Sequence, residues 1–258
     1  RSEVVRQKDL FVAVFANLAH NENKILKISE SLKAYNDRVK DHFANSNRFD
    51  GSNTQPFTQY VEGGSQTSIW GVPSLGIDPA TGEEIFIRPD GSITNTWNTN
   101  DQVVLGDTEP KIQGTFGLNA TYKNLSLYMT FMYEAGGQVY NSTLRDKVED
   151  VNIYTSNVDK RVFSERWKEP GDQARYRKLT SGVGGSIMRT RPTSRFVEDN
   201  NVLTLNSISL GYDFNAGQKW MKTIGLSMLR FEIGANDVCR WSSVKVERGL
   251  NYPYARSF

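Results

Sequence analysis

The sequence predicts an all-β fold made of long antiparallel strands, and three observations carry that prediction. Apolar and polar residues alternate through residues 114–122 and again through 125–133, which is the period of a strand with one apolar face. Each run is about 9 to 11 residues long, enough for a tilted strand to cross a bilayer. Short connections between strands alternate with connections that are tens of residues long, which is the layout of an outer-membrane barrel. Because a water-soluble sandwich gives a similar alternation, the period alone leaves both architectures open.

The composition excludes several classes of protein. A hydrophobic content of 38% and a mean hydropathy of -0.53 exclude a bundle of membrane helices, but not a barrel, because half of each barrel strand faces a polar lumen. The net charge of +2 gives no basic field for nucleic acid. Cys239 is the single cysteine, so an internal disulfide framework and a cysteine-rich metal site are excluded. Nothing at Arg1 resembles a signal peptide, so we expect an internal or processed piece if the protein is exported.

The first part of the chain is predicted to hold one strand, one helix and a long loop. Residues 8–18 form a strand that is apolar on both faces, so its orientation stays ambiguous. Residues 21–43 carry apolar side chains at spacings of three and four, which indicates an amphipathic helix. This helix packs on its own protein or binds a partner or a membrane surface. Turn residues fill 45–101, where only 84–88 reads as a short strand. We expect an extracellular loop over 20–110, a length that is usually functional.

A central hairpin organises the rest of the sequence. Strands over 111–122 and 125–138 are joined by a two-residue turn at Lys123 and Asn124. A second extracellular loop is expected over 141–200. It holds helical pieces near 144–154 and 158–167, the second of which ends at Pro170 and Gly171.

The alternation returns in two later strands, over 202–214 and 226–237, and a third extracellular loop follows over 239–251. In the last strand Arg230 and Glu232 stand opposite a continuous apolar face. Charged residues in that position suit a polar lumen better than the exterior of a sandwich.

The polar residues of the loops suggest no catalytic, metal or cofactor site. His20 and His42 lie beside polar segments without a nucleophile, so a catalytic triad has no support. The acidic pairs at 83–84 and 149–150 have the residue types of glycosidase carboxylates, but a solvated loop explains them better. The oxygen-rich run at 98–101 lacks the spacing of a calcium loop, and turn chemistry explains it.

Aromatic residues in the predicted loops are the candidate contacts for a ligand or a partner, because rings give a large contact area at low entropic cost. The alternative is that they pack into a small core of the loops themselves. The six candidates are Trp70, Trp97, Trp167, Trp241, Tyr60 and Tyr154. A basic cluster between Arg175 and Arg195 either meets an anionic ligand or lipid phosphates, or decorates a solvated loop.

Five stretches of the chain read YVEGGSQTSIWGVPSLGIDPATGEEIFIRPDG (60–91), GDTEPKIQGTFGLNATYKNLSLYMTFMYEAGGQVYNST (106–143), LNSISLGYDF (205–214), IGLSMLRFEIGANDV (224–238) and YPYARSF (252–258). These stretches resemble the SusC/RagA family of TonB-dependent transporters from the outer membrane of Bacteroidota. Their order and spacing agree with the family over nearly the whole chain.

The resemblance implies that residues 1–258 are a C-terminal segment of an antiparallel transmembrane β-barrel of about 22 strands, five of them within this chain. It implies that a plug, a segment that contacts the TonB complex and most strands precede this chain, and that one more strand follows it. It also implies localisation in the bacterial outer membrane. The implied activity is TonB-dependent uptake of oligosaccharides or peptides, without cofactor or enzymatic chemistry, together with a SusD-like surface lipoprotein.

Two alternatives come from other functional classes. A soluble all-β carbohydrate-binding module would bury the apolar face of residues 125–133 against a second sheet. A secreted glycoside hydrolase domain would place two carboxylates at a defined distance in a cleft. Neither alternative explains the family resemblance.

Overall fold

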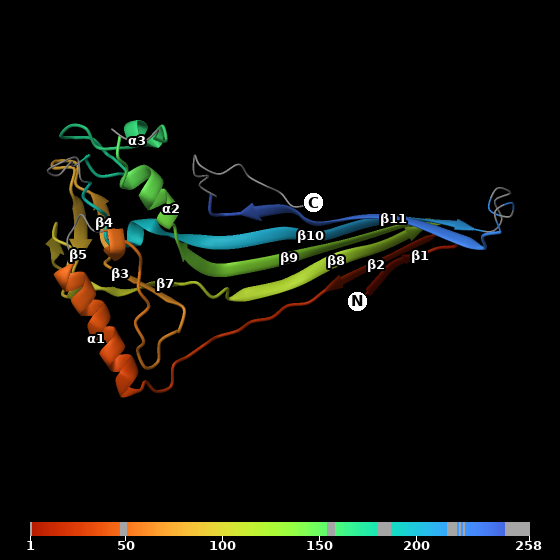
Figure 1. The fold of residues 1–258 in the computed structure, drawn as a ribbon, viewed down its shortest axis with the longest axis horizontal. Helices are drawn as coiled ribbons and strands as arrows, with labels where there is room; N and C mark the ends of the chain where they lie inside the picture. The colour runs from red at the N-terminus through yellow and green to blue at the C-terminus, as the bar shows by residue number, and fades with distance from the viewer. Residues whose placement is uncertain are drawn as a thin grey trace.

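The computed structural model describes residues 2–46, 51–153, 158–179, 187–215, 221, 223 and 225–245. Six strands form one antiparallel sheet in the order β1-β2-β8-β9-β10-β11. Their bounds are β1 (Ser2–Arg6), β2 (Leu10–Ala16), β8 (Ile112–Tyr122), β9 (Leu125–Tyr140), β10 (Val197–Asn215) and β11 (Met228–Ser242). The sheet extends from a head that contains the helices and the short strands (Figure 1). No helix in the described part of the chain is long and apolar enough to cross a membrane.

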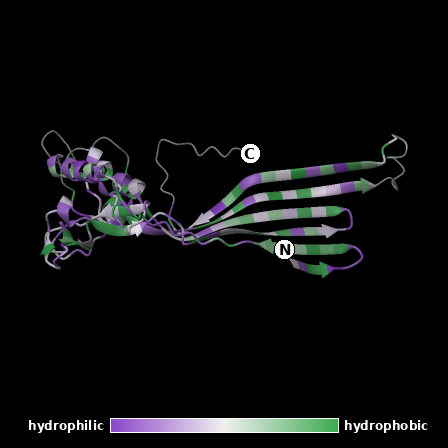
Figure 2. Ribbon diagram, turned by 90° about the horizontal axis from the view of Figure 1, so that it is seen from below, coloured by the Kyte–Doolittle hydropathy of each residue, from purple (hydrophilic) through white to green (hydrophobic). Residues whose placement is uncertain are grey.

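The register of the sheet gathers the apolar residues of its strands on one face. One row across five strands joins Val14 to Leu118, Leu118 to Met129, Met129 to Ile208, and Ile208 to Ala235. The neighbouring row on the other face joins Thr130 to Ser207. Because side chains alternate between faces, one face is apolar and the other is mainly polar. Figure 2 shows the resulting alternation of hydrophobic and hydrophilic residues along the long strands.

The register also settles the two faces of β2, which the sequence leaves ambiguous. Val12 and Val14 pair with Ala120 and Leu118 on the apolar face. Phe15 pairs with Gly117 on the polar face, where its ring stacks on Tyr128 with 6.1 Å between centroids. The aromatic residue is tolerated there because Gly117 leaves room for its ring: a Cβ at Gly117 would lie 2.4 Å from the Phe15 ring.

The expected count of five strands is too low, since the described residues form a sixth strand, β1, which pairs with β2 at the edge of the sheet. The sequence SEVVR offers only two apolar residues and no clear alternation, so its strand character comes from the pairing. At the head end, β9, β10 and β11 run further than expected. The third loop therefore begins after Ser242 and not at Cys239, because β11 stays paired with β10 up to the contact between Val202 and Ser242.

The predicted helix over 21–43 is shorter at its start. Helix α1 (Glu30–Asn45) begins after Ser29, whose side chain accepts a hydrogen bond from the backbone of Leu32. Residues 21–29 before it form no regular element, and Ile25 exchanges backbone hydrogen bonds with Gly63 and Gly64. The helix buries Val39 and Phe43 against the head, so packing on its own protein accounts for its apolar side.

The two predicted long loops are more structured than expected. The first holds a pair formed by β3 (Ser68–Gly71) and β7 (Val103–Asp107) and a three-stranded sheet of β4 (Ser74–Ile77), β5 (Glu84–Ile87) and β6 (Ile93–Thr94). Of these strands, β5 matches the short strand predicted over 84–88. The others have two to five residues each, too short for a visible period.

The second long loop has shorter helices than expected. These are α2 (Ser142–Leu144), which continues as the π-helical turn η3 (Arg145–Glu149), and α3 (Arg161–Ser164). The first predicted helix stops near Asp150, whose carboxylate accepts hydrogen bonds from Arg177 and Thr190. Tyr154, where that helix was expected to end, lies outside the described residues.

Candidate functional site

The head is one folded body built from both long connections of the sheet. Residues 17–111 leave β2 and return at β8, and residues 141–196 leave β9 and return at β10. A buried hydrophobic cluster draws on both connections and is formed by Ile69, Tyr140, Leu144, Val148, Val151, Val162, Tyr176 and Phe196. Since the cluster is shared, neither connection can move independently without exposing apolar surface.

A buried carboxylate, Glu84 of β5, lies in the middle of the head. Arg195 donates two hydrogen bonds to it, from Nε to Oε1 and from Nη2 to Oε2, each 2.8 Å long. Thr193 Oγ1 donates a third at 2.7 Å. Burial by itself raises the pKa of Glu84, but the charge and hydrogen bonds of Arg195 outweigh it and the pKa lies below its usual range. Glu84 is therefore ionised at neutral pH.

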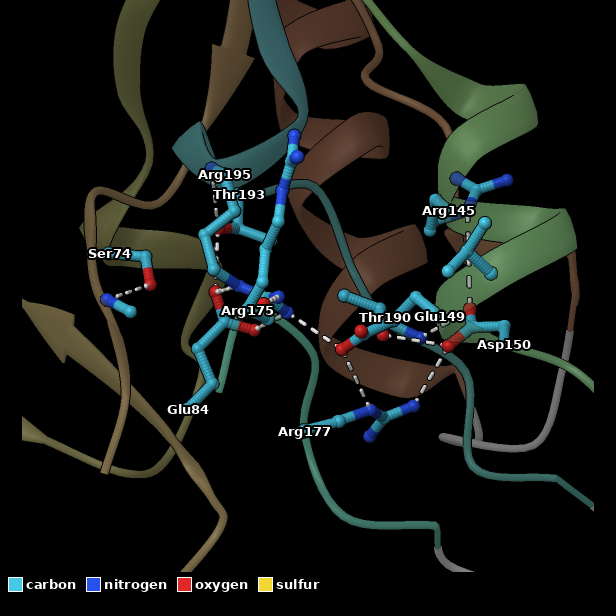
Figure 3. Close-up of polar contacts among 12 residues, drawn as sticks. Ser74, Glu84, Arg145, Glu149, Asp150, Arg175, Arg177, Thr190, Thr193 and Arg195 are labelled. Carbon is cyan, nitrogen blue, oxygen red and sulfur yellow. Dashed lines mark hydrogen bonds and ion pairs between the residues drawn. The ribbon is translucent and has the colours of Figure 1, made fainter. Parts of the chain in front are cut away.

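Arg195 connects Glu84 to a second buried carboxylate. Its Nη2 also donates to Oε1 of Glu149 at 2.8 Å, so one guanidinium bridges two acids (Figure 3). Burial lowers the pKa of Arg195, yet the charges of Glu149 and Glu84 raise it well above its ordinary value. The bidentate geometry is the one in which Arg binds a carboxylate most strongly.

Asp150 extends this network to the loop that follows α3. Its Oδ1 accepts from Arg177 Nη2 at 2.9 Å and from Thr190 Oγ1 at 2.7 Å, and its Oδ2 accepts from the Thr190 backbone at 2.7 Å. Arg177 Nε also lies 3.3 Å from Glu149 Oε1. On the other side, Arg145 is 1% exposed and its Nη1 donates to the carbonyl of Thr54. The network thus fastens the first connection to the second.

Arg166 reinforces the same region through backbone groups. Its guanidinium donates to the carbonyls of Val162 at 3.2 Å, Arg177 at 2.8 Å and Glu149 at 2.8 Å. Burial lowers the pKa of Arg166 from its ordinary value. These contacts hold η3, α3 and the segment around Arg177 in fixed positions.

A small polar pocket opens beside the network. It has a volume of about 80 Å³ and is lined by Glu83, Glu84, Phe86, Asn95, Thr96, Trp97, Arg177, Arg189, Thr190 and Arg191. Asn95 and Thr96 are exposed and mark its opening, whereas Phe86 and Thr190 are buried. We take this pocket as the candidate site because aromatic, basic and amide side chains converge on it.

Trp97 is the predicted aromatic residue that lines the pocket. Its indole Nε1 donates to the carbonyl of Pro192 at 3.0 Å, and its ring lies 5.2 Å from that of Phe43. The guanidinium of Arg191 lies over the ring at 4.8 Å. The ring is thereby fixed in place while its exposed part borders the pocket.

Three other predicted aromatics pack within the head and away from the pocket lining. Trp167 donates to the carbonyl of Pro79 at 2.8 Å. Tyr60 lies against Tyr35 with 5.8 Å between ring centroids. Trp70 lies on β3, partly buried and opposite Val104 of β7.

Trp241 and Tyr154 are the remaining two of the six aromatic candidates. Trp241 was expected in a loop, but it lies on β11, 52% exposed and opposite Leu203, on the apolar face of the sheet. Tyr154 lies outside the described residues.

The acidic pairs that the sequence places in solvated loops are mostly buried ion-pair partners. Glu84, Glu149 and Asp150 are at most 5% exposed, and half-buried Glu83 pairs with Lys178 at 3.0 Å. The run at 98–101 is a turn, as expected, with the Asn98 side chain accepting from the Asn100 backbone at 2.9 Å. Within the described ranges, no group of three or more His, Cys, Asp or Glu residues is arranged to hold a metal ion.

The buried arginines are the feature that sequence reasoning missed. Arg177 and Arg195 belong to the predicted basic cluster, but Arg177 is buried, the Arg195 side chain is only 10% exposed, and both are paired, so they do not decorate a solvated loop. Arg145 and Arg166 were not singled out at all. The spacing of the arginines gives no signal of burial, since Arg175, two residues before buried Arg177, is 56% exposed.

No family model matches the chain. Among curated proteins, the chain is similar to TonB-dependent receptors of Formosa agariphila. It is 22% identical to TonB-dependent receptor P3 over 245 residues, which cover 92% of this chain and 23% of the receptor. It is 26% identical to TonB-dependent receptor P39 over 136 residues, which cover 52% of this chain and 13% of that receptor. The chain thus spans less than a quarter of the length of either relative.

Solved structures with a similar fold belong to a transporter called RagAB. The chain superposes on the RagAB peptide transporter with a TM-score of 0.70 at 19% identity, covering 94% of this chain and 25% of that one. It superposes on the RagAB peptide importer in its open-open state with a TM-score of 0.66 at 21% identity, covering 96% and 24%. At these identities the likeness shows the fold, which is part of a large antiparallel barrel, as the sequence predicted.

Proposed function

We infer that this chain, a segment of a SusC/RagA-type TonB-dependent transporter, forms the C-terminal part of an outer-membrane barrel whose complete protein imports a nutrient. The observation that carries this proposal is the two-sided sheet. Its apolar face runs without interruption through the row from Val14 to Ala235, and its other face is mainly polar. An apolar face toward lipid and a polar face toward a lumen is the arrangement of a transmembrane barrel wall.

The edges of the sheet support the same proposal. Within the described residues, β1 and β11 each pair with a neighbour on one side only. In lipid every backbone polar group needs a partner, so both edges would pair with further strands of a closed barrel. The chain covers only 25% of the RagAB chain, which leaves room for those strands.

The proposed cargo is an oligosaccharide or a peptide, taken up with energy relayed by the TonB complex. The fold neighbour is called a peptide transporter, and the curated relatives are called TonB-dependent receptors. A SusD-like lipoprotein would bind the complete protein on the side of the head, and the TonB complex would contact segments outside this chain. Selectivity would then be a property of binding, without enzymatic chemistry.

The test uses the complete protein in its source cells. We expect disruption of its gene to abolish uptake of a subset of labelled peptides or oligosaccharides, and reintroduction of the gene to restore it. The protein itself should fractionate with the outer membrane and migrate faster on a gel before boiling than after. Unchanged uptake of every peptide and oligosaccharide tested, or a soluble protein indifferent to boiling, would overturn the proposal.

A further inference from the structure

We propose that the pocket between Trp97 and Arg189 binds a carboxylate group of the imported ligand. This inference rests on the proposed import function and names the chemistry of the ligand. It follows from the charges around the pocket, from the room inside it and from the position of its opening.

The two acids that line the pocket are already neutralised from outside it. Glu84 is held by Arg195 through two hydrogen bonds of 2.8 Å. Glu83 pairs with Lys178 at 3.0 Å. Neither Arg195 nor Lys178 is part of the lining. The acids therefore add little net negative charge to the pocket.

Arg189 gives the lining an excess of positive charge. Arg177 is paired with Glu149 and Asp150, whereas Arg189 donates to the backbone carbonyl of Asp150 at 3.3 Å. The side chain of Asp150 is occupied by Arg177 and Thr190. In the described part of the chain, Arg189 has no carboxylate partner. A half-buried guanidinium without such a partner attracts an anion more strongly than one in free solvent.

Neighbouring groups suit a carboxylate in particular. Asn95 and Thr96 bring exposed polar side chains to the opening of the pocket, whereas the hydroxyl of Thr190 already donates to Asp150. Arg191, stacked on Trp97 at 4.8 Å, lies in the same wall, and its Nη2 donates to the carbonyl of Ser46 at 2.9 Å. A planar guanidinium matches the two oxygens of a carboxylate, and Trp97 offers an aromatic surface for the adjoining part of the ligand.

The size of the pocket limits what enters it. About 80 Å³ is more than one water molecule needs, but far less than the roughly 300–1,000 Å³ of a site that encloses a whole small ligand. Only a terminal group can enter, while the remainder lies outside near Asn95 and Thr96. Two sources supply such a group within the proposed cargo: an acidic or C-terminal residue of a peptide, and a uronic acid of an oligosaccharide.

The experiment titrates the full-length receptor, purified in detergent, with matched pairs of probes by calorimetry. One pair is a short peptide with a free C-terminus and its C-terminal amide. The other is a uronate-containing oligosaccharide and a neutral one of the same length. We expect the acid of one pair to bind about tenfold or more tightly than its neutral counterpart. The pair that shows this preference identifies the source of the carboxylate.

Variants of Arg189 and Arg175 test which arginine causes the preference for an acidic ligand. Arg189→Gln should abolish it, and Arg189→Lys should keep part of it, because the charge remains while the planar fork is lost. Arg175→Gln is the matched control, since this arginine belongs to the same loop but is 56% exposed and pairs with Glu198 outside the pocket. The proposal is overturned if the wild-type receptor shows no preference for either acid, if Arg189→Gln retains it, or if Arg175→Gln loses it equally.

The uptake experiment separates this inference from the function on which it rests. If gene disruption leaves uptake unchanged, import itself is wrong. If disruption abolishes uptake while Arg189→Gln keeps the preference for an acid, import stands and only the carboxylate pocket is wrong.

Discussion

Glu83 and Glu84 are adjacent in sequence but differ in burial, because Glu84 is buried and Glu83 is half-buried. We expect Glu84→Gln to destabilise the head by about 3–5 kcal/mol, because it leaves the buried charge of Arg195 without one of its two acids. Hydrogen exchange of head amides in the full-length protein measures this as a lower free energy of local opening.

Glu83→Gln is the matched control for this prediction. Its carboxylate is 33% exposed and its partner Lys178 is 35% exposed, so the pair is worth about 0–1 kcal/mol. Equal effects of the two substitutions would show that burial of the Glu84 pair contributes nothing, contrary to the prediction.

The Glu84 carboxylate makes the stability of the head depend on pH. The pKa of Glu84 is lower in the folded head than the usual 4.5, so the folded state binds its proton more weakly than the unfolded state does. Its stabilising contribution is therefore complete above about pH 4.5 and declines as the pH falls toward the folded pKa. Hydrogen exchange between pH 6 and pH 3, corrected for intrinsic rates, should show this decline. A Glu84→Gln protein with the same slope would contradict it.

The residues of the site were only partly predictable from sequence. Trp97 was recognisable as an aromatic residue in a long loop. The ion network was not, because its partners are far apart in the chain: Glu84 meets Arg195 across 111 residues and Glu149 meets it across 46. From sequence alone, charged residues in a loop are expected to be exposed to solvent, because a buried partner becomes visible only in the folded head.

The pairing between strands β2 and β8 depends on one glycine, Gly117 of β8. A Cβ at Gly117 would lie 2.4 Å from the Phe15 ring and 2.4 Å from the backbone oxygen of Met129. We expect Gly117→Ala to cost about 1–3 kcal/mol through overpacking and to lower the yield of folded barrel on an unboiled gel. Gly234→Ala is the control, since its nearest neighbour would be 3.6 Å away, and an equal loss from both would refute the steric explanation.

The apolar face of β9 should respond to charge in a way that the other face does not. Met129 lies in the row that joins Leu118 and Ile208, near the middle of the strand's apolar run. We expect Met129→Lys to cost about 2–4 kcal/mol in the membrane, because a lysine there would face lipid. Ser207→Lys, on the opposite face, should cost much less. Refolding of both full-length variants into lipid vesicles, followed by urea titration, measures the difference; a reversed order would mean that the faces are assigned the wrong way round.

The long strands could be predicted, but of the short ones only β5, which the sequence shows as a short strand over 84–88, could be. β8 and β9 alternate over enough residues to define both their faces and their turn at Lys123. β1 has five residues, and the strands of the head have two to five, so no period is visible in them. Trp241 was misplaced in a loop because the alternation breaks at a bulge between Leu205 and Ser207, where β10 and β11 change register.

At the scale of the whole molecule, the two ends of the sheet differ in kind. Both long connections gather in the head at one end, and Lys123 lies at the other, where its backbone donates to the Asp9 carbonyl. In the proposed barrel, long connections are extracellular and short turns periplasmic. The head would therefore present the pocket on the side from which a nutrient arrives.

Labelling of single cysteines on intact cells tests this orientation. In the full-length protein with Cys239→Ser, we expect Lys168→Cys in the head to react with a membrane-impermeant maleimide. Gln7→Cys, in the exposed turn between β1 and β2, should react only after the outer membrane is permeabilised. The reason is that a bilayer around the apolar face separates the two ends of the sheet, so a reagent outside reaches one of them. Labelling of Gln7→Cys alone on intact cells would mean that the orientation is the reverse of the proposed one. Equal labelling of Gln7→Cys and Lys168→Cys would show that no membrane lies between the two positions.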